Sequence, residues 1–222
     1  MRDKPVNEIL NSIAQAAEGE ASPGTALGKV SKWRPDPFHI LIATVLSQRN
    51  RDECTYLAAR RLFEVYDSPK DLAGAPQEEV DELIHSVNFH FGKTEAIRKI
   101  ARIIHVDYHD QVPSDVNALM ALPMVGRKTA TCVQAYAFKI DAICVDTHVH
   151  RISNRIGLVR TRTPAQTEEK LMKIVPKNRW REVNEIMVRF GQQICTPLHP
   201  KHGECNITQF CDYYQKHRGK KD

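Results

Sequence analysis

The chain has 222 residues, of which 41% are hydrophobic and 27% are charged, a composition typical of a globular protein and unlike that of a disordered, collagen-like or low-complexity chain. No stretch approaches the roughly 18 uninterrupted apolar residues of a membrane span, and the first residues contain no apolar run, so we expect neither a membrane protein nor a secreted one. The formal net charge of +5 fits an anionic partner, although many proteins without such a partner share it.

Apolar residues recur at helical spacing along almost the whole chain, and no segment alternates with the period of two that a half-buried strand requires. The apolar stripes predict helices over 6–17, 38–46, 54–65, 76–87, 97–104, 114–122, 127–138, 171–175 and 180–194. The sequence also contains no repeat at a fixed period. We therefore predict an all-α fold.

A turn with proline and glycine lies between two of these helices, where residues 122–130 read Leu-Pro-Met-Val-Gly-Arg-Lys-Thr-Ala. The second helix begins with backbone N–H groups that have no partner within the helix, at the positive end of the helix dipole. A phosphate binds readily at such a site, and Arg127 adds positive charge. This turn resembles the helix-hairpin-helix motif that binds DNA, although a plain packing corner between two helices explains it equally well.

Lys128 lies in the first turn of this helix, where the helix dipole and the neighbouring Arg127 both disfavour its ammonium form. Both effects favour the neutral amine, which is the nucleophilic form of lysine. An ordinary surface lysine is the alternative, and the position alone is a weak signal.

Asp146 follows eighteen residues after Lys128, in the segment Val-Asp-Thr-His-Val-His-Arg that spans 145–151. It comes directly after an apolar stretch and before a helical pattern, which is the position of an N-cap. A capping carboxylate can still point toward a neighbouring cavity. Considered alone, the segment favours the N-cap over a catalytic carboxylate.

The six cysteines fall into two groups. Three are scattered in apolar surroundings and are most simply small core residues: Cys54, Cys132 and Cys144. The other three, Cys195, Cys205 and Cys211, lie within 17 residues of one another near the C-terminus. Because the expected compartment is reducing, this cluster predicts metal ligation and not disulfides.

Together, the hairpin, the Val-Asp-Thr-His segment and the cysteine cluster resemble endonuclease III, a DNA glycosylase/lyase family of the helix-hairpin-helix superfamily. The resemblance extends from about Pro37 to Tyr214. It implies a two-lobed all-α glycosylase fold with a six-helix lobe over 31–139 that contains the helix-hairpin-helix. The second lobe would combine 1–30 with 140–222 and carry a C-terminal metal-cluster loop.

The resemblance implies a bifunctional DNA glycosylase and AP lyase that removes damaged, oxidised pyrimidines from duplex DNA in base excision repair. Lys128 would be the nucleophile that attacks C1′ of the sugar and forms a Schiff base. Asp146 would stabilise the positive charge on the sugar and help to deprotonate the amine. β-Elimination would then break the strand on the 3′ side.

Two alternatives remain open at this point. One keeps the fold and changes the substrate, giving a uracil/thymine mismatch glycosylase or a pyrimidine-dimer glycosylase. The other is a non-catalytic helix-hairpin-helix DNA-binding module, against which the presence of both Lys128 and Asp146 speaks. In each case the partner is double-stranded DNA, here with a damaged base or an abasic site. We expect a monomer in the cytoplasm, associated with the nucleoid through DNA and not with a membrane.

An enzyme that acts on a stacked base must flip it out of the duplex and fill the gap. In this family two loops do so, corresponding here to 46–52 and 87–93. Arg49 takes the place where the family commonly has glutamine, with Gln48 beside it, and Phe89 would be the wedge between base steps. A surface charge at Arg49 and ordinary core packing of Phe89 are the alternatives.

Further contacts with DNA are expected from the hairpin and from the segment around Asp146. The resemblance places them at Val125, Gly126, Arg127, Thr129 and His148. Basic residues near the C-terminus are additional candidates for phosphate contacts: Lys201, Lys216, Arg218, Lys220 and Lys221. For the last four, a solvated tail is the alternative.

The sequence departs from the family pattern in the hairpin, where Met124 stands at a position that is usually glycine. If this position requires a positive φ, methionine costs about 1 kcal/mol or more. The contact of the hairpin amides with phosphate is then less secure than in the family.

The second departure is in the metal-binding pattern. The family spacing Cys-x6-Cys-x2-Cys-x5-Cys is preserved as Cys195-x6-His202-x2-Cys205-x5-Cys211, so the second ligand is histidine. Three thiolates and one imidazole suit a [4Fe–4S] cluster with one histidine ligand or a tetrahedral zinc ion. The spacing favours iron–sulfur, the ligand set alone favours zinc, and a cluster held by three cysteines with His202 turned away is a third possibility.

Overall fold

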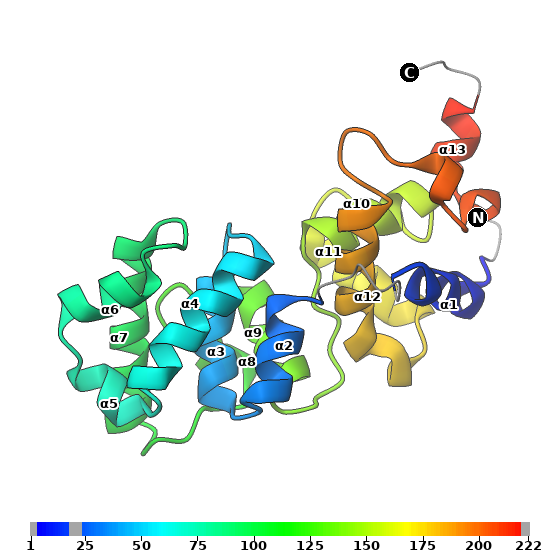
Figure 1. Ribbon diagram of the computed structural model, residues 1–222. Helices are drawn as coiled ribbons and strands as arrows, with labels where there is room; N and C mark the ends of the chain where they lie inside the picture. Colours follow the sequence, from blue (N-terminus) through cyan, green and yellow to red (C-terminus); the bar gives the residue numbers. More distant parts are fainter. Residues whose placement is uncertain (1–3, 18–23, 219–222) are drawn as a thin grey trace. The chain divides into compact units, whose positions relative to one another are not determined.

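The computed structural model describes residues 4–17 and 24–218, so Lys220 and Lys221 lie outside the described part. Within these ranges the chain forms α-helices and short 3-10 helices and no strand, which confirms the all-α prediction (Figure 1). Over the same residues, no helix is long and apolar enough to cross a membrane.

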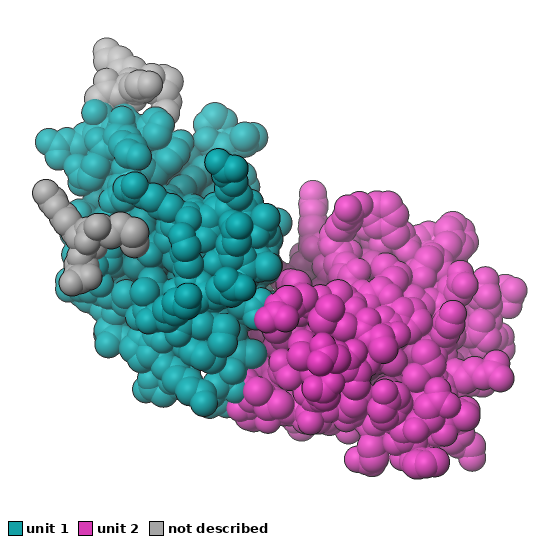
Figure 2. Space-filling view, turned by 180° about the vertical axis from the view of Figure 1, so that it is seen from behind, with its two compact units in different colours: residues 1–24, 141–222 teal, residues 25–140 magenta. Residues whose placement is uncertain are grey.

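The chain divides into two compact units (Figure 2). Unit 1 combines residues 1–24 with 141–222, and unit 2 spans 25–140. The expected six-helix lobe began at residue 31, whereas unit 2 begins with Thr25, whose side chain caps α2 (Ala26–Trp33). Residues 25–30 belong to unit 2 because α2 packs against the neighbouring helices of that unit.

Unit 2 contains eight helices, two more than the resemblance implies. After α2 they are α3 (Pro37–Leu46), α4 (Asp52–Val65), α5 (Pro69–Gly74), α6 (Gln77–Ile84), α7 (His90–Val106), α8 (Val116–Met120) and α9 (Arg127–Tyr136). α5 and α8 have only 6 and 5 residues and account for the difference.

α3 is the centre of unit 2. Asp36 caps its first turn and Pro37 occupies the first position, a pair of residues that favours a helix start. Every residue from Phe38 to Leu46 is buried, because α2, α4, α7 and α9 pack around this helix. A helix that is apolar on all sides is stable only in such a surrounded position.

Unit 1 brings the N-terminal helix against the C-terminal part of the chain. Its α-helices are α1 (Val6–Ala17), α10 (Thr147–Ile156), α11 (Pro164–Ile174), α12 (Trp180–Gln193) and α13 (Asp212–His217). Three 3-10 helices complete the described part of this unit: η1 (Lys177–Arg179), η2 (His202–Glu204) and η3 (Thr208–Phe210).

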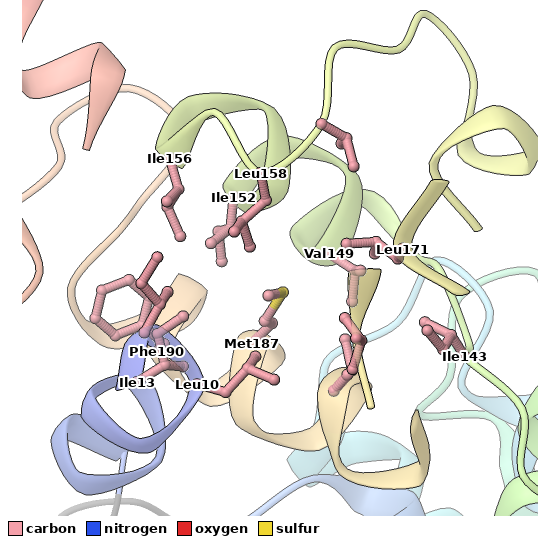
Figure 3. Packing of buried hydrophobic residues seen from close by; sticks show 14 of the residues in the cluster. Leu10, Ile13, Ile143, Val149, Ile152, Ile156, Leu158, Leu171, Met187 and Phe190 are labelled. Atoms are coloured by element: carbon pink, nitrogen blue, oxygen red, sulfur yellow. The ribbon is translucent and has the colours of Figure 1, made fainter. Parts of the chain in front are cut away.

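The core of unit 1 forms where α1 and α10 both pack on α12. Leu10 and Ile13 of α1 lie beside Phe190 of α12, with Met187 and Ile152 in the same cluster (Figure 3). All five side chains are fully or almost fully buried, so removal of any of them would leave a cavity.

The three scattered cysteines differ in burial. Cys132 and Cys144 are buried, as expected of core residues, but both are disulfide-bonded, so the expectation that the chain uses no disulfides is wrong for these two. Cys54 is only half-buried, although it shares a face of α4 with the buried Ala58 and Leu62, because it lies in the first turn of that helix.

Candidate functional site

The hairpin between α8 and α9 is held by two buried side chains and a tight turn. Leu122 and Val125 are 4% and 5% exposed, and the Val125 amide donates to the Leu122 carbonyl at 3.1 Å. Gly126 is the N-cap of α9, is exposed and makes no side-chain cap. A Cβ at Gly126 would meet no atom within 4 Å, so the backbone at this helix start is open to an approaching anion.

Met124 at the tip of the turn adopts a left-handed conformation with φ of 57°. This is the position that is usually glycine in the family, and the expected strain of about 1 kcal/mol is therefore present. Its carbonyl accepts a hydrogen bond of 2.7 Å from Gln48 Nε2, which also lies 3.2 Å from Thr129 Oγ1. Gln48 thus ties the loop after α3 to the hairpin.

Lys128 occupies the first turn of α9 in unit 2 and is half-buried. The face of α9 that includes Ala130 and Val133 is buried, and α9 packs on α3. Arg127 beside Lys128 is exposed. The lysine therefore lies at the border between the packed side of the helix and solvent.

Asp146 is the N-cap of α10 in unit 1, as the sequence predicts. Its Oδ1 accepts from the Val149 amide at 2.9 Å, and its side chain is half-buried. Such a cap engages one of the two carboxylate oxygens, so capping and chemistry are compatible roles for this residue. The cap also fixes the direction in which the carboxylate points.

Arg151 connects the Asp146 segment to the loop that begins at Cys195. Its Nη2 donates to the Cys195 carbonyl at 2.8 Å and lies 3.1 Å from His148 Nδ1. Burial lowers the pKa of Arg151, and the nearby Cys195 and Asp146 oppose this effect. A Cβ on Gly191 would lie 2.4 Å from His148 Nδ1, so α12 approaches α10 closely only because residue 191 is glycine.

The four predicted metal ligands line a single cavity in unit 1. Cys195, His202, Cys205 and Cys211 all contribute to its wall, together with apolar residues that include Ile207. Burial raises the pKa of the Cys205 thiol and of the Cys211 thiol. No three His, Cys, Asp or Glu side chains of the described chain converge on the position of one ion; these donors surround a space instead.

Hydrogen-bond donors point at two of the sulfur atoms of this cavity. Arg155 Nη1 lies 3.4 Å from Cys195 Sγ, and the Tyr214 amide donates to Cys211 Sγ at 3.5 Å. The His202 ring packs edge-on against Tyr214, with ring centroids 5.1 Å apart. The donors around sulfur would stabilise thiolates, and the ring contact holds His202 at the cavity.

The two expected gap-filling residues lie next to each other in unit 2. Arg49 is exposed, and its guanidinium carbon is 5.9 Å from the centroid of the Phe89 ring. Core packing of Phe89 is excluded, because the side chain is 63% exposed. Both residues have left-handed backbones, with φ of 51° and 59°.

The remaining expected DNA contacts differ in their accessibility. Gly126 and Arg127 are exposed, whereas Val125 and Thr129 are buried and would approach DNA only through their backbone. His148 is half-buried beside Arg151. The sequence alone did not indicate a role for Lys93, Arg151 or Gly191. Lys93 could have been noticed, because a lysine on the buried stripe of a helix is unusual.

These features define a class of protein, the helix-hairpin-helix DNA repair proteins. The family model described as "HhH-GPD superfamily base excision DNA repair protein" matches residues 42–177. Among solved structures, a trapped endonuclease III–DNA covalent intermediate superposes with a TM-score of 0.78 at 35% identity, over 87% of this chain and 95% of that one. A thermostable thymine-DNA glycosylase gives a TM-score of 0.81 at 25% identity, over 95% and 96%.

Two similar proteins define the family within this class. Endonuclease III of Thermotoga maritima is 49% identical over 185 residues, which cover 83% of this chain and 86% of that protein. Endonuclease III of Bacillus subtilis is 36% identical over 182 residues, with 82% and 83% covered. The chain therefore belongs to the endonuclease III family.

Proposed function

We propose that Lys128 and Asp146 carry the two reactions of this base excision repair enzyme, a DNA glycosylase with AP lyase activity. The observation that supports this most directly is the lysine in the first turn of α9, directly after a hairpin whose backbone is open to phosphate. The substrate class is duplex DNA with a damaged, oxidised pyrimidine, or with an abasic site left after base loss.

In the glycosylase step the neutral amine of Lys128 attacks C1′ of the damaged nucleotide. The bond between C1′ and the base breaks, and the base leaves with the bonding electrons. The sugar carries positive charge as this bond lengthens, and the Asp146 carboxylate stabilises that charge and accepts a proton from the amine. Opening of the sugar ring then gives an imine between Lys128 and C1′.

In the lyase step the imine acidifies the hydrogen on C2′. Its removal breaks the bond between C3′ and its oxygen, so the strand is cut on the 3′ side of the lesion and the phosphate leaves with the bonding electrons. Hydrolysis of the imine releases Lys128. An enzyme without this amine would stop after base removal, so Lys128 favours the bifunctional reaction.

DNA is held by the hairpin and by the exposed pair in unit 2. The open N-terminus of α9 and the exposed Arg127 suit a backbone phosphate. Arg49 and Phe89 fill the gap that the flipped nucleotide leaves, since an aromatic wedge beside a cation can stack on bases and contact phosphates.

Cys195, His202, Cys205 and Cys211 hold a [4Fe–4S] cluster in this proposal, with a zinc ion as the alternative. The residues fit the cluster, because four donors line one cavity and N–H groups point at two of the sulfur atoms. Its role is structural: it fixes the irregular segment from Thr196 to Phe210. Iron and sulfide near four per chain would identify the cluster; one zinc per chain would identify the alternative.

The test of the catalytic proposal is borohydride trapping on a panel of duplexes with oxidised pyrimidines, mismatched uracil or thymine, pyrimidine dimers or an abasic site. Borohydride reduces the imine and leaves a covalent protein–DNA adduct. We expect an adduct with the wild type on oxidised pyrimidines and none with Lys128→Ala. Lys99→Ala is the matched control, because it removes an exposed lysine outside the hairpin and keeps the Lys128 amine. An undiminished adduct with Lys128→Ala would assign the chemistry to another amine.

A further inference from the structure

Lys93 is a buried lysine that the proposed chemistry does not use. Its side chain is 1% exposed, and its Nζ donates to the carbonyls of Leu46 and Gln48, both at 2.7 Å. Burial lowers the pKa of Lys93 to about 8. It lies in the first turn of α7, at the positive end of the dipole of that helix, so only its contacts with the end of α3 offset the cost of its burial.

A second link joins the same two segments. Asn88 precedes α7, and its Nδ2 donates to the Arg49 carbonyl at 2.8 Å. Its amide lies 3.5 Å from Asn50 Oδ1. Residues 88 and 93 therefore hold the loop after α3 through three successive parts of its backbone, at residues 46, 48 and 49.

These bonds fix the two peptide groups on either side of the Arg49 Cα atom. The Gln48 carbonyl belongs to the preceding peptide and is held by Lys93; the Arg49 carbonyl belongs to the following peptide and is held by Asn88. A residue other than glycine keeps a φ of 51° only where its surroundings determine it. Lys93 and Asn88 supply that determination and place Arg49 beside Phe89.

We propose that Lys93 is a positioning residue for lesion binding, which, with Asn88, presents Arg49 and Phe89 as one preformed wedge. The inference rests on the proposed function, in which this pair fills the gap left by the flipped nucleotide. A wedge that is ordered before binding loses little conformational freedom when it enters the duplex. The preordered wedge therefore strengthens binding mainly to DNA in which a flipped nucleotide or a missing base has left space in the base stack. The continuous stack of undamaged DNA has no room for the wedge.

The test is the ratio of the dissociation constants for an undamaged duplex and for the same duplex with a tetrahydrofuran abasic analogue. We expect Lys93→Met to lower this ratio about tenfold, as Phe89→Ala does, while affinity for undamaged DNA stays nearly unchanged. Lys99→Met is the matched control, since it removes an exposed lysine from the same helix and should leave the ratio intact.

A double-mutant cycle separates positioning from simple destabilisation. If Lys93 acts through the wedge, Lys93→Met has no further effect on the ratio once Phe89 is alanine. A ratio unchanged in Lys93→Met, an equal loss on both duplexes, or a loss that adds to that of Phe89→Ala would each overturn the inference.

Two further measurements keep the test decisive. If Lys93→Met does not fold, Asn88→Ala breaks the exposed link to Arg49 without touching the core, and the same fall in the ratio is expected. Borohydride trapping at saturating protein is scored on the same variants, and Lys93→Met should still trap because Lys128 is intact. Loss of trapping by the wild type would refute the proposed chemistry, whereas the binding ratio would still decide the role of Lys93.

Discussion

The irregular segments of the two units are held in place by different means. In unit 2, the hairpin has its own buried anchors, Leu122 and Val125, and the neighbouring loops are joined by hydrogen bonds from Lys93 and Gln48. In unit 1, the segment 196–210 contains one buried residue, Ile207. From this comparison we expect that unit 2 presents its proposed DNA-binding side chains by protein contacts alone, whereas unit 1 depends on the proposed metal group to order residues 196–210.

The largest effect is expected in unit 1, where loss of a proposed metal ligand should destabilise the segment that the ligand holds. Cys205→Ser removes one proposed ligand from the cavity, and we expect the amides of α10, α12 and α13 to lose hydrogen-exchange protection by about 3 kcal/mol or more. Amides of α3 and α7 in unit 2 should keep theirs. Cys54→Ser is the control, because that cysteine lies on α4. If α13 stays as protected as in the wild type, the cavity does not organise this segment through a bound group.

The second effect, also in unit 1, distinguishes the role of Asp146 as a helix cap from its proposed role in catalysis. Asparagine caps helices as well as aspartate does, so Asp146→Asn should keep the bond to Val149 and the stability of α10. Without the carboxylate charge, single-turnover base excision should slow about a hundredfold or more, which is about 3 kcal/mol in the barrier, while DNA affinity stays near that of the wild type. Asp36→Asn makes the same change at the cap of α3 and should leave the rate unchanged. Full activity in Asp146→Asn would reduce Asp146 to a cap.

A third effect probes the buried cation that holds unit 2. The pKa of Lys93 is about 8 in the folded protein and near 10.5 when the chain is unfolded. Between these values the unfolded state binds more protons, so the contribution of Lys93 to the free energy of unfolding rises with pH, by up to about 3 kcal/mol. Urea unfolding of the wild type and of Lys93→Met from pH 7 to 10.5 should show a growing difference in favour of the wild type. A difference independent of pH would mean that Lys93 is not held as a buried cation.

Local sequence information was sufficient for much of the fold. The apolar stripes predicted α1, α3, α9 and α12 to within about two residues at each end, because an amphipathic or fully apolar period needs no tertiary knowledge. α2 had no predicted counterpart, since its buried positions include Ala26 and Gly28, which make a weak stripe. α13 was missed for a related reason: it has 6 residues and none of them is buried.

The candidate site was less predictable, because its positions depend on contacts distant in sequence. The N-cap role of Asp146 followed from its place after an apolar stretch, and the structure confirms the cap. The catalytic roles of Lys128 and Asp146 came from the family resemblance, not from spacing. Lys93 lies on the same buried stripe as Ile97, Ile100 and Ile104, but only the carbonyls at the end of α3 explain a charge at that position.

The smallest expected effect concerns the strain in the hairpin of unit 2. Met124 has a φ of 57°, where glycine is unstrained and any residue with a Cβ is not. Met124→Gly and Met124→Ala both remove the side chain, but only glycine relieves the strain, so the glycine variant should be more stable than the alanine variant by about 1 kcal/mol. Both variants lose the contacts of the Met124 side chain, which is 43% exposed, and this loss offsets the relief of strain, so the glycine variant should stay close to the wild type in stability. Thermal unfolding of the three proteins measures this order, and an alanine variant as stable as the glycine one would show that the turn bears no strain at this residue. Affinity for undamaged duplex should be the same in both variants, because the amides at the start of α9 are unchanged.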